Sequence, residues 1–304
     1  MTPRSYGFEV WDVFTDRAFG GNPLAVIRDA RGMDAAAMQA VAREFNFSES
    51  TFVLPPGTAA GTARVRIFTP TDELPFAGHP TVGTAIALAT AGEAFGVPVG
   101  DRLVLEEGVG PIACVISRDG GAWQATFTTE TPFRRLGDVD VADAAACLSL
   151  PTTAIRSDRH PPTLATKGLA FAVVELADMA ALDAATPDLA AFRTAAARYP
   201  AVAGHFHVAA YVQSKPEQVA MRMFAPLSGV IEDPATGSAA AALGALLCVL
   251  DGAPVTLAIA QGVAMGRPSA IRVRAETRAG LSMVQVGGGA VRVMQGTLEL
   301  PPAP

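Results

Sequence analysis

The sequence has little cysteine and little charge. Its three cysteines are Cys114, Cys147 and Cys248; they lie far apart, and no Cys-x-x-Cys pair occurs. This pattern argues against a disulfide framework, a cysteine-based zinc site and a thioredoxin-type redox motif. A reducing cytoplasmic location is the expected setting.

Charged residues make up only 17% of the chain, against 50% hydrophobic residues. This composition excludes a disordered, coiled-coil or collagen-like protein. The net charge of -6 disfavours nucleic acid and anionic membrane surfaces as partners. Any anionic ligand would therefore have to be held by local features of the fold.

Long apolar segments and nucleotide-binding motifs are also missing. The longest apolar run, Ala239–Leu250, is too short to span a membrane, and the N-terminus has no apolar signal core. Gly108 and Gly110 lack the third glycine of a dinucleotide motif, and no phosphate-binding Gly-Lys loop is found. His205 and His207 lack a third ligand nearby. We therefore expect a soluble protein with neither cofactor nor metal.

What is present is enough chain for two hydrophobic cores of about 150 residues each. The 304 residues alternate irregularly between short β-rich runs and Ala-rich segments, which favours an α+β fold over a doubly wound parallel sheet. Residues 131–140 are expected to connect the domains, and Gly287–Gly289 to form a turn or hinge. Helices are predicted at Met33–Phe45, Val82–Ala94, Val141–Leu148, Met179–Tyr199 and Thr236–Leu250.

An internal duplication organises the chain. His79–Ala87 aligns with Asp233–Ala241 on the pattern x-Pro-x-x-Gly-(Ser/Thr)-Ala-x-Ala, at an offset of 154 residues. Upstream, Arg66–Pro70 aligns with Arg222–Pro226 at an offset of 156. Each copy predicts a strand, a loop with proline, and a helix with Pro and Gly near its start. The predicted domains are 1–125 plus 290–304, and 126–289.

The two helix starts are candidate anion sites. Free backbone N–H groups and the helix dipole favour a carboxylate there, and glycine lets a ligand approach the backbone. A single copy would more simply be an ordinary Ala-rich packed helix, but two matching copies favour binding. The predicted substrate-binding residues at these starts are Gly78, Thr81, Gly83, Thr236, Gly237 and Ser238.

Three side chains are candidates for proton transfer. His79 and Asp233 stand at equivalent positions of the two helix starts, although a structural imidazole and an N-cap are the simpler explanations of each alone. Glu49 lies among apolar and aromatic residues just before a strand, where desolvation would raise its pKa toward neutrality. A turn glutamate that faces water is the alternative. The second half offers no acidic counterpart of Glu49, since the comparable stretch places Val208 there.

Four motifs in order resemble the PhzF family of phenazine-biosynthesis-type isomerases, within the diaminopimelate epimerase-like superfamily. The resemblance covers most of the chain. The motifs are Phe14–Val26, Asn46–Val53, Arg66–Pro70 with Glu73–Thr81, and Phe224–Pro226 with Glu232–Ala239.

The resemblance implies two similar α+β domains, each a barrel-like, mostly antiparallel sheet around a central helix, with the active site in the cleft between them. It implies Glu49 as the catalytic acid/base and His79 and Asp233 as further catalytic residues. It also implies that the backbone of Gly78, Gly237 and Ser238 contacts the substrate carboxylate, and it adds Asn22 as a binding residue. A homodimer is expected on this ground alone.

Related epimerases use two cysteines, one at each helix start, and this sequence has neither. We therefore expect a cofactor-independent isomerase that shifts a proton, and with it a double bond, in a small carboxylic acid. One alternative is an amino-acid or hydroxy-acid epimerase that works without the thiol pair. The other is a protein that binds small carboxylates without catalysis.

Overall fold

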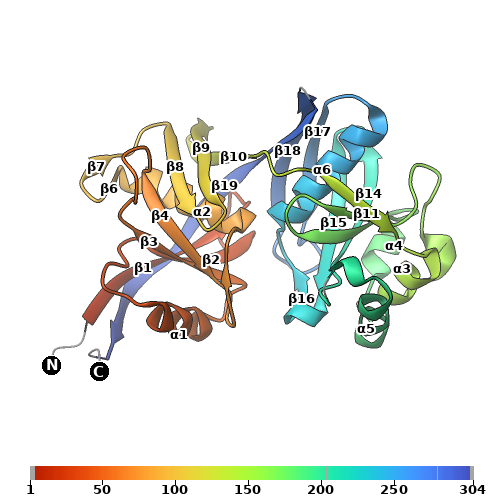
Figure 1. Ribbon diagram of the computed structural model, residues 1–304, viewed down its shortest axis with the longest axis horizontal. Coiled ribbons are helices and arrows are strands. Elements are labelled where there is room, and N and C mark those ends of the chain that lie inside the picture. Colours follow the sequence, from red (N-terminus) through yellow and green to blue (C-terminus); the bar gives the residue numbers. More distant parts are fainter. Residues whose placement is uncertain (1–3, 203, 279, 302–304) are drawn as a thin grey trace. The chain divides into compact units, whose positions relative to one another are not determined.

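The computed structural model describes residues 4–202, 204–278 and 280–301. The chain divides into two compact units, residues 1–128 with 287–304 and residues 129–286 (Figure 1). The boundaries expected from the sequence lie three residues away, at 125 and 290. None of the helices in the described ranges combines the length and hydropathy that a membrane crossing requires.

Unit 1 is a closed ring of strands. β1 pairs with β2, β2 with β3, β3 with β4, β4 with β8, β8 with β9, β9 with β10, β10 with β19, and β19 with β1. β2–β3 and β4–β8 are parallel, whereas β1–β19, β1–β2, β3–β4, β8–β9 and β9–β10 are antiparallel. The strands of unit 1 are β1 Arg4–Val13, β2 Asn22–Ile27, β3 Glu49–Leu54, β4 Ala63–Phe68, β5 Glu73–Leu74, β6 Glu93–Ala94, β7 Val97–Pro98, β8 Arg102–Glu107, β9 Gly110–Asp119, β10 Ala122–Thr129 and β19 Leu281–Leu300.

Helix α2, Gly78–Ala91, occupies the inside of this ring. It contacts β1, β2, β3, β8 and β9, and all its residues from Gly78 to Ala89 are buried. A helix that is apolar and small-sided all round is stable only when it is buried on every face. Gly83 allows the closest approach, because a Cβ there would lie 2.6 Å from Leu24 and 2.7 Å from Val13 side-chain atoms.

Helix α1, Ala35–Phe45, is amphipathic and packs against β3 and β4 with Met38, Val41 and Ala42. The Asp34 carboxylate accepts a hydrogen bond from the Ala37 amide at 2.8 Å and caps its start. The helix therefore begins at Ala35 rather than at Met33. It ends at Asn46, whose left-handed backbone (φ 53°) turns the chain into β3.

Unit 2 repeats the pairing pattern of unit 1. β12–β13 is antiparallel, β13–β14 parallel, β14–β15 antiparallel, β15–β17 parallel and β17–β18 antiparallel, in the order seen for β1, β2, β3, β4, β8 and β9. Helix α6, Gly237–Asp251, is buried like α2 and packs against β12, β13, β17 and β18. The strands are β11 Arg134–Asp138, β12 Thr163–Thr166, β13 Ala170–Glu175, β14 Val208–Lys215, β15 Gln218–Ala225, β16 Val230–Asp233, β17 Val255–Gln261 and β18 Ser269–Arg278.

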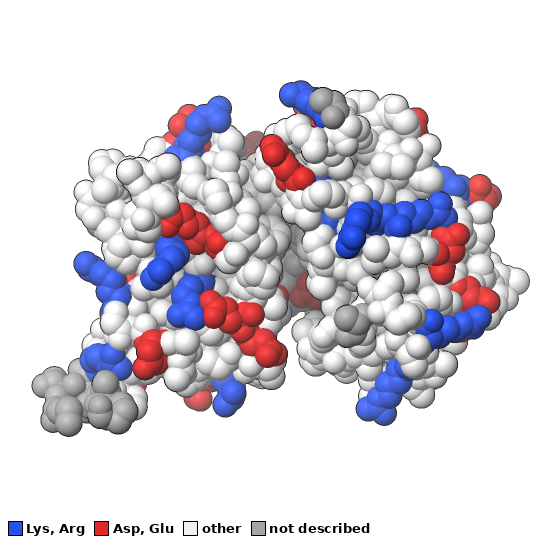
Figure 2. Space-filling model, viewed as in Figure 1, with Lys and Arg blue, Asp and Glu red and all other residues white. Residues whose placement is uncertain are grey.

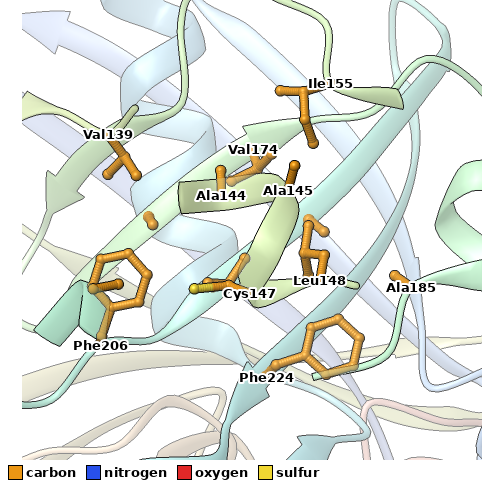
Figure 3. Packing of buried hydrophobic residues seen from close by; sticks show 14 of the residues in the cluster. Val139, Ala144, Ala145, Cys147, Leu148, Ile155, Val174, Ala185, Phe206 and Phe224 are labelled. Atoms are coloured by element: carbon orange, nitrogen blue, oxygen red, sulfur yellow. The ribbon is translucent and has the colours of Figure 1, made fainter. Parts of the chain in front are cut away.

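Three shorter helices cover a second core in unit 2: α3 Val141–Cys147, α4 Met179–Ala184 and α5 Leu189–Arg198. Ala144, Ala145 and Cys147 of α3 point into a cluster that includes Phe206 and Phe224 (Figure 3). The outer helices of unit 2 therefore pack on this apolar cluster.

Four further expectations about elements were wrong. The predicted helix 179–199 is two helices, because Pro187 cannot donate a helical hydrogen bond and the Asp188 carboxylate caps a new start at Ala191 N, 2.8 Å away. Residues 131–140 contain a strand, β11. Gly287–Gly289 lie inside the continuous strand β19 and form no turn, although the boundary between the two units does fall between Val286 and Gly287. Helix α2 begins at Gly78, so His79 lies within its first turn.

Candidate active site

Glu49 is fixed at the first position of β3, where that strand pairs in parallel with Leu24 of β2. The preceding residue, Ser48, donates its hydroxyl to the Asn22 side-chain oxygen at 3.2 Å. Asn22 is 1% exposed, so this contact anchors the chain at the start of β3. The Glu49 side chain itself is 18% exposed, which leaves the carboxylate partly desolvated and still accessible.

His79 lies beside this carboxylate. Its Nδ1 is 3.5 Å from Glu49 Oε2, and its side chain is 5% exposed. Burial lowers the pKa of His79 to about 3, and a hydrogen bond to the Pro23 carbonyl opposes that shift only in part. Although the pair is close enough to count as an ion pair, the imidazole is neutral at neutral pH, so the contact is not a salt bridge.

One ring nitrogen of His79 is left without a partner. Nε2 is buried and has no hydrogen-bond partner among the described residues. In a neutral imidazole one nitrogen donates a hydrogen bond and the other accepts one. The Nε2 atom is therefore a group that a ligand could bind, as an acceptor in the tautomer that carries its proton on Nδ1.

The other residues predicted at the α2 start divide into two groups. Gly78 begins the helix after Ala77, and no side chain in the described structure caps this N-terminus, which leaves first-turn amides for another acceptor. Thr81 and Gly83 face the interior instead. The Thr81 hydroxyl is used within the protein, and Gly83 provides room for β1 and β2.

Unit 2 carries the second set of predicted residues. Asp233 ends β16 and is 7% exposed, and its carboxylate accepts the Thr236 hydroxyl. Gln261 braces this loop: its side-chain amide donates to the Asp233 carbonyl at 2.7 Å and to Thr236 Oγ1 at 3.0 Å, and its oxygen accepts the Thr236 amide at 3.1 Å. Gly237 then begins α6, with Ser238 half-buried in its first turn.

An arginine–glutamate pair supports the loop before each helix. Arg66 of β4 binds both carboxylate oxygens of Glu73 at 2.7 and 2.6 Å. Arg222 of β15 does the same with Glu232 at 2.8 and 2.7 Å. Two-point contacts of this kind fix direction as well as distance. The duplication therefore repeats the loop support as well as the helix starts.

Strand register corrects one expectation about the duplication. Phe68 on β4 pairs with the second residue of β3, whereas its counterpart Phe224 on β15 pairs with Val208, the first residue of β14. The residue that corresponds to Glu49 is therefore His207, one position earlier than expected. His207 is buried, and burial lowers its pKa to about 4. The second unit thus has a neutral imidazole at this position.

Comparison with known proteins establishes the family. A family model described as phenazine biosynthesis-like protein matches residues 11–296. The chain belongs to this family. An uncharacterized isomerase of Mesorhizobium japonicum is 39% identical over 98% of the chain and 99% of its own length. The trans-2,3-dihydro-3-hydroxyanthranilate isomerase of Pseudomonas chlororaphis is 37% identical over 96% of the chain and 99% of its own length.

A solved structure agrees at the level of the fold. The phenazine biosynthesis protein of the PhzF family from Bacillus anthracis superposes with a TM-score of 0.85 at 22% identity, covering 97% of this chain and 99% of its own. The family model and the named isomerase relatives confirm the predicted family and the prediction of an isomerase, and the chain is an isomerase of the phenazine biosynthesis-like family.

Several groups that contact or support the candidate site residues were not predicted from the sequence. The Pro23 carbonyl and Ser48 act through the backbone and a short hydroxyl, which no motif singles out. Glu107 and Gln261 were detectable, because they lie 154 positions apart, the same offset that relates His79 to Asp233.

Proposed function

We propose that the protein is a cofactor-independent isomerase that moves a proton, and with it a double bond, within a small carboxylic acid, with Glu49 as the acid/base. The observation that carries the proposal is a partly exposed carboxylate 3.5 Å from a buried, neutral imidazole. A single carboxylate that removes a proton from one carbon can return it to another position on the same face of the substrate.

In this proposal His79 accepts a hydrogen bond from a polar group of the substrate through Nε2, and thereby orients it. The uncapped first turn of α2 at Gly78 holds the substrate carboxylate. In unit 2, Asp233 is assigned an orienting role, and Gly237 and Ser238 a binding role at the start of α6. Fixed amide dipoles are suited to the enolate-like charge that develops when a proton is lost next to a carboxylate.

Cysteine chemistry gives no support to a two-thiol racemase. All three cysteines are buried. Burial raises the pKa of Cys147 to about 12, and it raises that of Cys114 further still. A thiol in that condition supplies almost no thiolate at neutral pH. The proton chemistry is therefore assigned to the carboxylate.

The test replaces Glu49 with Gln and follows turnover and solvent-proton exchange in deuterated water. The first probe is trans-2,3-dihydro-3-hydroxyanthranilate, because a 37%-identical relative is named for acting on it. Loss of a positioned acid/base should lower turnover about a hundredfold to ten-thousandfold while leaving ligand binding nearly intact. Glu44→Gln, on the exposed face of α1, is the matched control and should behave like wild type.

Three results would contradict the proposal. Deuterium incorporation by Glu49→Gln at the wild-type rate would show that another group moves the proton. Inversion of a chiral centre without movement of a double bond would identify an epimerase. Tight binding of a panel of small carboxylates, without any solvent exchange, would identify a binding protein.

A further inference from the structure

Glu107 is a buried carboxyl group that the proposed chemistry does not use. It ends β8, is 7% exposed, and its Oε1 lies 2.8 Å from the hydroxyl of Thr81 in the first turn of α2. Its Oε2 is buried and has no hydrogen-bond partner among the described residues. The following turn is also attached to the loop before α2, since Val109 N donates to the Pro75 carbonyl at 3.0 Å.

The hydrogen atoms around Thr81 indicate which form of Glu107 is present. Thr81 Oγ1 lies 2.8 Å from the Ala77 carbonyl oxygen as well as 2.8 Å from Glu107 Oε1. A threonine hydroxyl has one hydrogen, and a carbonyl can only accept. If Glu107 is ionised, the single Thr81 hydrogen has to be shared between Glu107 and the Ala77 carbonyl, whereas a protonated Glu107 can donate to Thr81 and both contacts are then full hydrogen bonds.

The second unit supports the same conclusion. Gln261 ends β17 as Glu107 ends β8, and each strand pairs in parallel with the strand that carries the arginine of the unit's Arg–Glu pair. The Gln261 side chain, a neutral donor and acceptor, braces the turn at Thr236 that begins α6. A protonated carboxyl group, like a side-chain amide, can both donate and accept a hydrogen bond without carrying a charge. Glu107 therefore occupies the place of a neutral amide.

We propose that Glu107 is a positioning residue that acts as a neutral carboxylic acid, bracing the first turn of α2 so that Gly78 and His79 receive an anionic substrate. This inference rests on the proposed function. Ionisation of Glu107 would remove its donated hydrogen bond to Thr81. It would also place a negative charge beneath the turn that holds the substrate carboxylate, so that KM should rise while kcat changes little.

The surroundings of Glu107 are consistent with a neutral form. On β9 it faces the Cys114 thiol, whose own pKa is raised by burial, and on α2 it faces Thr81. The two arginines of β4 have other partners, since Arg64 interacts with the neighbouring Glu106 and Arg66 binds Glu73. Burial raises the pKa of Glu107 to about 8, against a weaker opposing effect of the Thr81 hydrogen bond.

The kinetic experiment measures kcat and KM from pH 6 to pH 10 for wild type and Glu107→Gln, with trans-2,3-dihydro-3-hydroxyanthranilate. Wild-type KM should rise about tenfold per pH unit above about pH 8. Glu107→Gln should match wild type within about twofold at pH 7 and lack this rise. Gln261→Glu places a carboxyl group at the corresponding position of unit 2. Its KM should rise at alkaline pH in a way that the wild-type Gln261 does not cause. A KM that rises equally in wild type and Glu107→Gln would overturn the inference.

A second measurement needs no substrate. The folded protein keeps the Glu107 proton up to about pH 8, whereas the unfolded chain releases it near the ordinary glutamate pKa of 4.5. Wild type should therefore lose stability relative to Glu107→Gln as pH rises between these values, and the gap between their urea midpoints should widen from pH 5 to pH 8. A constant gap would show that Glu107 is already ionised and would overturn the inference.

The two proposals can fail separately. If Glu49→Gln retains turnover but Glu107→Gln removes the alkaline rise, the assignment of the base is wrong and the positioning role stands. If Glu49→Gln loses turnover but Glu107→Gln keeps the wild-type profile, the positioning role is wrong.

Discussion

At the scale of single residues, burial decides which ionisable groups stay neutral. His79 and His207 have pKa values lowered to about 3 and about 4, and burial also lowers that of His160. These imidazoles act as neutral hydrogen-bonding groups. The carboxylate beside His79, Glu49, is 18% exposed, and the proposed function assigns the proton transfer to it.

The neutral state of His79 can be tested by its effect on stability. An unfolded chain protonates this imidazole near pH 6.5, whereas the folded protein keeps it neutral to about pH 3. Stability should therefore fall as pH decreases below 6.5, by up to about 1.4 kcal/mol per pH unit from this residue. Urea unfolding between pH 7.5 and pH 5 should show this loss in wild type and not in His79→Asn.

His205→Asn, at an exposed position, is the control and should keep the wild-type slope. Direct titration of the His79 ring by NMR gives an independent check. A midpoint near 6.5 would show that the imidazole is protonated in the folded state, and the neutral assignment would then be wrong.

At the scale of elements, α2 and α6 determine the architecture. Both helices are rich in alanine and contain two glycines each, and both are buried along nearly their whole length. Gly83 in α2 and Gly244 in α6 each stand where a Cβ would come within 2.6 Å of a strand side chain, on Leu24 and Val273 respectively. The helices can therefore lie close to their sheets only where a residue has no side chain.

Gly83→Ala tests this close packing. Alanine normally stabilises a helix relative to glycine by about 0.5–1 kcal/mol, whereas overpacking a core costs about 1–3 kcal/mol. Because the new methyl group would meet Val13 and Leu24, we expect net destabilisation, measured by urea unfolding. Thr90→Ala on the exposed end of α2 should leave stability within about 0.5 kcal/mol of wild type. Stabilisation by Gly83→Ala would contradict this account.

The sequence was informative where local chemistry determines structure. Pro80 and Pro234 with their glycines revealed the two helix starts, and the repeat predicted their likeness. It was uninformative where contacts come from distant segments. The register of β14 against β15 makes His207, rather than Val208, the counterpart of Glu49, and strand pairing keeps Gly287 within β19. Both depend on partners far away in the chain.

The dependence on distant segments also explains two residues whose roles could not be predicted from the sequence. The Gly287 position appears as a turn in sequence, but its missing Cβ makes room for Thr126 Oγ1 and the Ala125 carbonyl on β10. Glu107 appears as one of several surface-like glutamates until β8 is placed beside α2. Side-chain roles that depend on strand pairing require the pairing to be known first.

At the scale of the whole molecule, both ends of the chain build unit 1. The boundary between the units falls between Val286 and Gly287, inside the 20-residue strand β19. The later part of β19 pairs with β1 from Arg4↔Leu300 to Val13↔Ala290, and β19 also pairs with β10. On the face shown in Figure 2, acidic and basic side chains are interspersed over each unit with large uncharged areas.

Removal of residues 287–304 should therefore open the ring of unit 1. β1 would lose its long antiparallel partner, and the apolar surface of α2 and the inner strand faces would become accessible to water. Unpaired strand edges next to exposed apolar surface favour aggregation. We expect the chain ending at Val286 to be insoluble or to lack a cooperative thermal transition, whereas the chain ending at Leu300 should melt like wild type. A soluble chain 1–286 with an unchanged near-ultraviolet circular dichroism spectrum would show that β19 is not required to close unit 1.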